Sequence, residues 1–147
     1  MTPTLSTTPG RLQSHFGLQD PRLQSVSMPQ IIPLAVTATP ATLTSPQLLQ
    51  GFINVTVAAA ATLTLPTASD LCNNIQGCMV GTSFEVEVRA TGAGGATIAV
   101  PAGGQGVTIS GTAATATANT RTLLINFTNV GIGTEAYTVY SKGAGAF

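Results

Sequence analysis

The sequence predicts an all-β fold: an antiparallel β-sandwich, jelly-roll-like or related, with one or two short helices and an extended N-terminal arm. Two observations lead to this prediction. Beyond residue 41, short segments rich in Val, Ile and Thr alternate with Gly-rich turns, which is typical of sandwiches and barrel-like domains. Before residue 41, prolines are concentrated. We therefore expect an arm at 1–40 and, at 41–147, a β-sandwich domain of about seven or eight strands.

The arm holds six of the nine prolines. Proline fixes φ, lacks an amide donor and favours extended neighbours, so this region should be extended. The arm also carries many apolar side chains with little charge, unlike a solvated disordered tail. Apolar side chains on a segment that cannot form its own core usually bury against something else. The residues that we expect to contact a partner are Arg11, Leu12, His15, Phe16, Leu18, Arg22, Leu23, Ile31 and Ile32.

The tetrapeptide RLQS occurs twice in the arm, at 11–14 and at 22–25. If the partner is an assembly of identical subunits, the two RLQS segments can bind equivalent sites on two adjacent subunits. Arg11 and Arg22 would then bind carboxylate or carbonyl oxygens. The extended backbone then adds main-chain hydrogen bonds at a sheet edge. The alternative, to which we give equal weight, is chance recurrence in a segment rich in Gln, Ser and Leu.

Two short helices are expected near the start of the domain. In TLTSPQLLQGF at 42–52, Ser45 can cap a helix, Pro46 fits its first position and Gly51 can end it. A second helix is expected at 68–76, closed by Gly77.

The expected strands are recognised by β-branched residues and by alternation of apolar and polar side chains. The clearest is TSFEVEVRA, in which Phe84, Val86 and Val88 share one face. In the last strand, Tyr137 and Val139 should share a face and Tyr140 should lie on the other. The expected strands lie at 53–57, 60–66, 82–90, 96–101, 106–111, 112–118, 121–130 and 134–142.

The composition excludes several classes of function. Charged residues make up 7% of the chain, against a typical value of about 25%. The net charge is zero, whereas a nucleic-acid-binding protein needs a clustered basic face, so no nucleic-acid partner is expected. No segment has the run of apolar residues needed to span a bilayer, and no signal peptide is visible, so we expect synthesis in a cytoplasm.

No catalytic, cofactor or metal site is expected. The only histidine, His15, lies in the arm, so the domain has no base for a catalytic triad and no histidine for a metal site. Glu85 and Glu87 share one strand face, where the choice lies between a Ca²⁺ or acid–base pair and the polar side of an amphipathic strand. We favour the polar side. The glycine clusters at 92–95 and 103–106 lack a following helix and a lysine, which predicts hairpin turns rather than phosphate loops.

The two cysteines, Cys72 and Cys78, have the spacing C-x5-C. They can close a disulfide loop in an oxidising compartment or remain reduced as two small, buried apolar side chains. We favour the reduced pair.

Four segments carry a resemblance to a known group of proteins: ATLTLPTASDL at 61–71, VGTSFEVEV at 80–88, GGQGVTISG at 103–111 and INFTNVGIGTEAYTVY at 125–140. Together they resemble a β-rich structural domain of virion proteins from tailed phages and large double-stranded DNA viruses. The resemblance spans roughly residues 42–141 and does not include the arm. It implies a capsid-associated or fibre-associated structural protein, often oligomeric, with no catalytic residues.

These observations lead to the expectation of a structural virion protein, a minor capsid or decoration (cement) protein whose arm docks on neighbouring capsid subunits. The expected partners are the major capsid protein or other virion proteins, together with copies of the chain itself, most simply as a homotrimer. The alternative is a fibre-head or adhesin-type module that binds a receptor or glycan. For glycan binding, the candidate residues are Glu135, Tyr137 and Tyr140.

Overall fold

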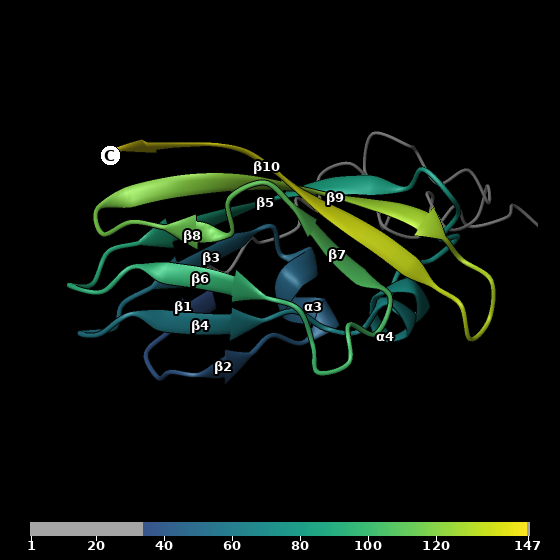
Figure 1. Cartoon of the computed structure of the whole chain (residues 1–147), viewed down its shortest axis with the longest axis horizontal. Coiled ribbons are helices and arrows are strands. Elements are labelled where there is room, and N and C mark those ends of the chain that lie inside the picture. Colours follow the sequence, from purple (N-terminus) through teal and green to yellow (C-terminus); the bar gives the residue numbers. More distant parts are fainter. Residues whose placement is uncertain (1–33, 147) are drawn as a thin grey trace, which may run out of the picture. The chain divides into compact units, whose positions relative to one another are not determined.

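The computed structural model describes residues 34–146, all of which belong to the compact unit Ile31–Phe147. These residues form mostly β-strands with two short helices (Figure 1). The elements in chain order are β1 (Leu34–Val36), β2 (Ala41–Thr42), α3 (Ser45–Leu49), β3 (Phe52–Val55), β4 (Ala61–Thr64), α4 (Ala68–Asn73), β5 (Ser83–Ala90), β6 (Ala96–Ala99), β7 (Val107–Ser110), β8 (Ala114–Thr115), β9 (Asn119–Asn129) and β10 (Ala136–Ala146).

The strands form two sheets. One has six strands in the order β1-β3-β5-β9-β10-β7, and the other has four in the order β2-β4-β6-β8. From β1 to β9 each successive strand therefore lies in the sheet opposite to the one before it. Among the strands of residues 34–146, only β9 and β10 follow each other in the chain and also pair, as an antiparallel hairpin.

The mostly β fold with short helices is confirmed, but both sheets are mixed, so the purely antiparallel pairing expected from the sequence is wrong and a jelly-roll arrangement is not confirmed. Strands β1, β3 and β5 pair in parallel, as do β2, β4 and β6. Strand β7 pairs in parallel with β10, whereas β9 pairs antiparallel with both β5 and β10. Among β1 to β6, two strands that pair in parallel are separated in the chain by one strand of the opposite sheet. Each turn of the chain therefore places one strand in either sheet, and successive turns stack on one another.

The stacking explains the glycine cluster at 92–95, for which the sequence predicts a hairpin turn. The loop between β5 and β6 lies against the loop between β3 and β4: the Gly94 amide donates to the Val57 carbonyl at 3.1 Å and the Ala61 amide to the Gly95 carbonyl at 2.8 Å. A Cβ at Gly92 would stand 2.1 Å from the Val57 carbonyl oxygen. Glycine is needed here because two backbones touch, and the loop joins strands of different sheets. The 103–106 cluster likewise joins β6 to β7 in the other sheet.

A single hydrophobic core draws on both sheets. The alternation of β5 is confirmed, because Val86 and Val88 are fully buried. Tyr137 and Val139 are buried and Tyr140 is exposed, as the alternation of the last strand predicts. The largest fully buried side chains are Tyr137, Phe127, Leu48, Ile53, Leu63, Leu65, Leu71, Leu123 and Ile125.

Both predicted helices exist, with different ends. Helix α3 is capped by Thr44 rather than Ser45: the Thr44 hydroxyl accepts from the Gln47 amide at 3.4 Å, and the Gln47 side chain accepts from the Thr44 amide at 2.9 Å. This reciprocal pair is a capping box. Helix α4 ends at Asn73, before the predicted end at residue 76, and Gly77 lies in the turn that follows.

Strand β1 lies within the segment expected to be arm. It pairs with β3, and Val36 is buried in the core. The sheet therefore begins before the expected division at residue 40. The described residues contain ten strands rather than seven or eight, because β1 and β2 carry too few residues for alternation to reveal them.

Candidate functional site

The nine arm residues expected to bind a partner, from Arg11 to Ile32, lie outside the described residues. The site of interest on the folded domain must therefore be sought in residues 34–146. Four features of that part of the chain bear on function: the carboxylates of β5, the tyrosines of β10, a groove beside the short helices, and an apolar end.

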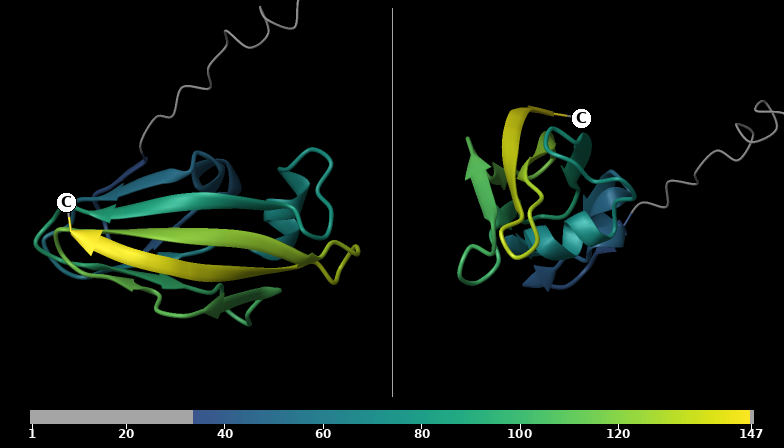
Figure 2. Two further views of the ribbon diagram at one scale, coloured as in Figure 1. Left: turned by 90° about the horizontal axis from the view of Figure 1, so that it is seen from above. Right: turned by 90° about the vertical axis from the view of Figure 1, so that its right-hand side faces the viewer.

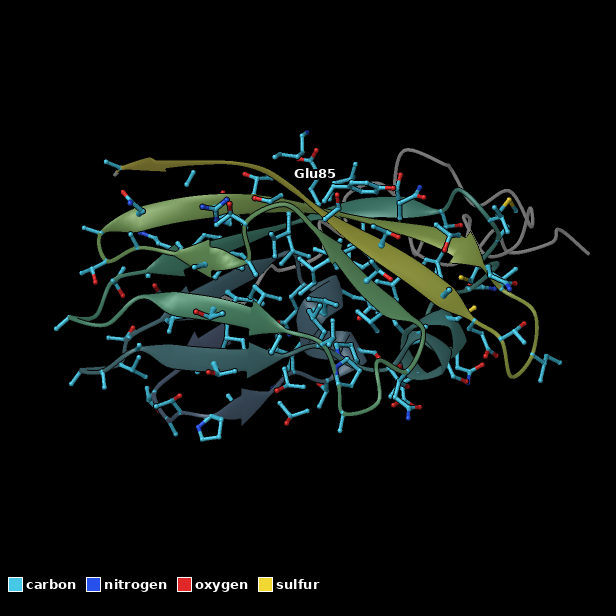
Figure 3. The ribbon with its side chains drawn as sticks, in the orientation of Figure 1. Glu85 is labelled. Carbon is cyan, nitrogen blue, oxygen red and sulfur yellow. The ribbon has the colours of Figure 1, made fainter. Side chains whose placement is uncertain are left out.

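The carboxylates of β5 lie on the sheet surface. Glu85 projects from β5 away from the sheet (Figure 3) and forms an ion pair with Lys142 of β10. Both side chains are about half exposed. An exposed pair of this kind adds little to stability because solvent screens it. The described residues contain no group of three or more His, Cys, Asp or Glu side chains that could hold a metal ion.

The tyrosines of β10 do not form a glycan-binding cluster. Tyr137 is fully buried, its hydroxyl donates to the Pro66 carbonyl at 2.7 Å, and its ring lies 5.7 Å from that of Phe127. Burial raises the pKa of Tyr137 above its usual value, because the ionised phenolate would lose its hydration. Of the three candidates, Tyr137 is thus part of the core, and Tyr140 faces the opposite side of the strand.

A groove of about 840 Å³ lies at the carboxyl ends of β2, β4 and β6, which all point toward α3 and α4 (Figure 1). Such ends of parallel strands are common binding positions in open sheets. Asp70 is the one ionisable side chain in the lining of the groove. Its other walls are Ser45, Asn74 and several threonines, together with prolines and aliphatic side chains such as Leu43 and Leu65. The groove is therefore lined mainly by uncharged side chains.

The apolar end consists of Met79, Val80 and Ile132. Their exposed fractions are 63%, 62% and 99%. Met79 and Val80 lie in the loop between α4 and β5, and Ile132 lies at the tip of the turn between β9 and β10. Figure 2 shows this loop and this turn at the same end of the long strands. The backbone joins the loop to β9, since the Gly81 amide donates to the Phe127 carbonyl at 2.8 Å.

No periodicity or charge pattern in the sequence predicts the apolar end. A signal for it exists in GIG at 131–133, where an isoleucine stands between two glycines at a turn, a position usually taken by a polar residue. The segment MVG at 79–81 is similar, because its two apolar residues follow no strand pattern.

Within residues 34–146, neither helix has the length or the apolar character to cross a membrane. Comparisons with protein-family models, with curated proteins and with solved structures found no significant match to this chain. The described residues thus define a class only by their architecture: a β-rich domain with two mixed sheets, an open groove and an apolar end.

Proposed function

We propose that the chain is a structural virion protein: a minor capsid or decoration (cement) protein that binds other virion proteins through its N-terminal arm and through the apolar end of its domain. The observation that carries the proposal is the exposure of Met79, Val80 and Ile132 at one end of the domain. Exposed apolar side chains that gather on one part of a surface are typical of protein interfaces.

The composition of the surface supports the same proposal. Five basic and five acidic residues in 147 leave a zero net charge, and a free monomer with so little charge has little electrostatic protection from association. A chain that is covered by neighbouring subunits has no need of that protection. In an oligomer with closed symmetry, the apolar end of each subunit can be covered by a neighbouring copy through few contacts. We propose a homotrimer as the simplest such form.

The alternative function, a receptor- or glycan-binding fibre head, has less support. Glycan sites need exposed aromatic side chains, and Tyr137 is buried in the core. The sequence contains two tyrosines, and of these only Tyr140 is exposed on the described domain.

Sedimentation with virus particles tests the proposal. Particles purified from the infected cells that produce the chain are mixed with the recombinant full-length protein and pelleted through a cushion. The full chain should pellet with the particles, and the variant Met79→Ser/Val80→Ser/Ile132→Ser should pellet about tenfold less, since three apolar contacts are lost. The control is Tyr140→Thr, which changes a half-exposed side chain away from the apolar end. If the triple variant pellets as well as the control, the apolar end is not the contact surface.

A further inference from the structure

The two cysteines lie together at the end of α4. The Ile75 amide donates to the Cys72 carbonyl at 3.2 Å, and the Cys78 amide donates to the Ile75 carbonyl at 3.2 Å. These two consecutive turns bring the chain back on itself after the helix, helped by Gly77, whose φ of +71° is a left-handed conformation. As a result Cys72 and Cys78 lie close together at the two ends of this short segment, near enough for Cys72 to raise the pKa of Cys78.

The surroundings of the pair leave the sulfur atoms accessible. Both side chains are free thiols of intermediate exposure, and both pack on the edge of the hydrophobic core. A thiol pair that is partly exposed can be reached by a small disulfide in solution, whereas a fully buried pair cannot.

The structure assigns a redox role to this pair: we propose that Cys72 and Cys78 form a reversible intramolecular disulfide by exchange with a low-molecular-weight disulfide such as oxidised glutathione. The thiols are reduced in a cytoplasm and oxidised outside the cell, where disulfides persist.

The chemistry balances in two exchange steps. The Cys72 thiolate attacks one sulfur of the small disulfide, forms a mixed disulfide and releases one small thiol. The Cys78 thiolate then attacks the Cys72 sulfur, closes the internal bond and releases the second small thiol. The two protein thiols lose two electrons and two protons in total, and the small disulfide is reduced to two thiols.

The environment of Cys78 favours this order of attack. Burial, together with the hydrogen bond and the charge of Cys72, raises the pKa of Cys78 to about 12. Cys78 is therefore protonated at neutral pH, and only a thiolate attacks a disulfide. After the first step Cys72 is part of a neutral mixed disulfide, so a Cys72 thiolate, one of the causes that raise the pKa of Cys78, is no longer present.

The bond would constrain the loop that carries Met79 and Val80. That loop is held at its far side by the Gly81 amide and by the Thr82 hydroxyl, which accepts from the Met79 amide at 3.0 Å. A link from Cys72 to Cys78 fixes its near side to α4. This consequence for docking depends on the proposed function, whereas the bond itself does not.

The test uses the purified, reduced full-length chain in excess oxidised glutathione at pH 8, without denaturant. Free thiols are counted with a chromogenic disulfide, and the product is analysed by mass spectrometry and peptide mapping. We expect both thiols to disappear, the mass of the single chain to fall by two hydrogen atoms, and a peptide linked through Cys72 and Cys78 to appear. Reduced glutathione in excess should restore both thiols.

The variants Cys72→Ser and Cys78→Ser supply the matched control. Each retains one thiol and should accumulate the mixed disulfide with glutathione, because no second thiol is present to displace it. The proposal is overturned if the natural chain keeps both thiols while a model peptide thiol in the same solution is oxidised. It is also overturned if the natural chain accumulates the mixed disulfide or links to a second chain instead of closing the internal bond. All of these results are obtained without particles and do not depend on the pelleting experiment.

Discussion

Individual residues show how closely the two sheets are connected. Gly92 and Gly94 lie where one loop rests directly on the backbone of another, and a Cβ at Gly94 would stand 2.0 Å from the Ala59 carbonyl oxygen. Tyr137 joins the sheets in a different manner, because its hydroxyl reaches from β10 to the Pro66 carbonyl just beyond β4. Both contacts are between segments distant in the sequence.

The first prediction concerns these glycines. Gly92→Ala and Gly94→Ala should each lower the free energy of unfolding by about 2–3 kcal/mol, because the loops must move apart to admit a methyl group. Gly145→Ala is the matched control, since a Cβ there meets nothing within 4 Å. Urea denaturation followed by circular dichroism measures all three. Equal stability of Gly94→Ala and the control would show that the two loops do not touch as described.

The second prediction concerns Tyr137. Tyr137→Phe should lower the free energy of unfolding by about 1–2 kcal/mol, because the Pro66 carbonyl loses its buried donor. The pKa of Tyr137 is raised in the folded state. The stability that this residue contributes is therefore fully present at a pH below its unfolded pKa of 10.0. Above that pH the unfolded chain releases the phenol proton while the folded chain keeps it. Stability should therefore fall by about 1.4 kcal/mol per pH unit toward the folded pKa.

Urea titrations at pH 9, 10 and 11 provide the measurement. The difference in unfolding free energy between the natural chain and Tyr137→Phe should shrink as the pH rises through this range. A constant difference would mean that Tyr137 ionises equally in both states, contrary to its burial.

At the scale of elements, the sequence predicts strands better than it predicts their partners. Every strand from β3 to β10 falls within or overlaps a predicted segment, because alternation and β-branched residues report burial of one face. Parallel pairing leaves no such local signal. The Gly-rich loops were interpreted as hairpins because glycine permits both a tight turn and a close backbone contact, and the sequence alone does not distinguish the two.

The short elements were harder to predict for a different reason. Strand β1 has three residues and β2 has two, so neither displays a period. The N-cap of α3 was placed one residue late, because both Thr44 and Ser45 suit that position and the reciprocal contact with Gln47 decides between them. The apolar end was missed because exposure at a loop depends on the tertiary structure.

The third prediction tests the contribution of β1. A chain that begins at Ile31 keeps β1, whereas a chain that begins at Thr37 loses its pairing with β3 and the burial of Val36. The shorter chain should be less stable by at least about 2 kcal/mol, the value of one buried valine side chain. Thermal and urea melts of the two chains compare them. Identical melts would place β1 outside the cooperative unit.

At the scale of the whole molecule, the low charge, the apolar end and the expected arm all favour a subunit of a larger assembly. The domain is built from stacked turns of chain, and its three most exposed large apolar side chains, Met79, Val80 and Ile132, lie at one end of the long strands. In the proposal, the arm supplies affinity by linking weak contacts, since a second contact on the same chain forms at a high effective concentration.

The most direct test of this account compares particle binding by the full chain and by the chain that begins at Ile31. Both are mixed with purified particles at equal concentration, pelleted and quantified, after circular dichroism has shown that the shorter chain is folded. The account predicts that the full chain pellets with the particles and that the shorter, folded chain pellets at least about tenfold less, because the linked contacts of the arm are gone. Equal pelleting of the two chains, or failure of the full chain to pellet at all, would contradict the central claim.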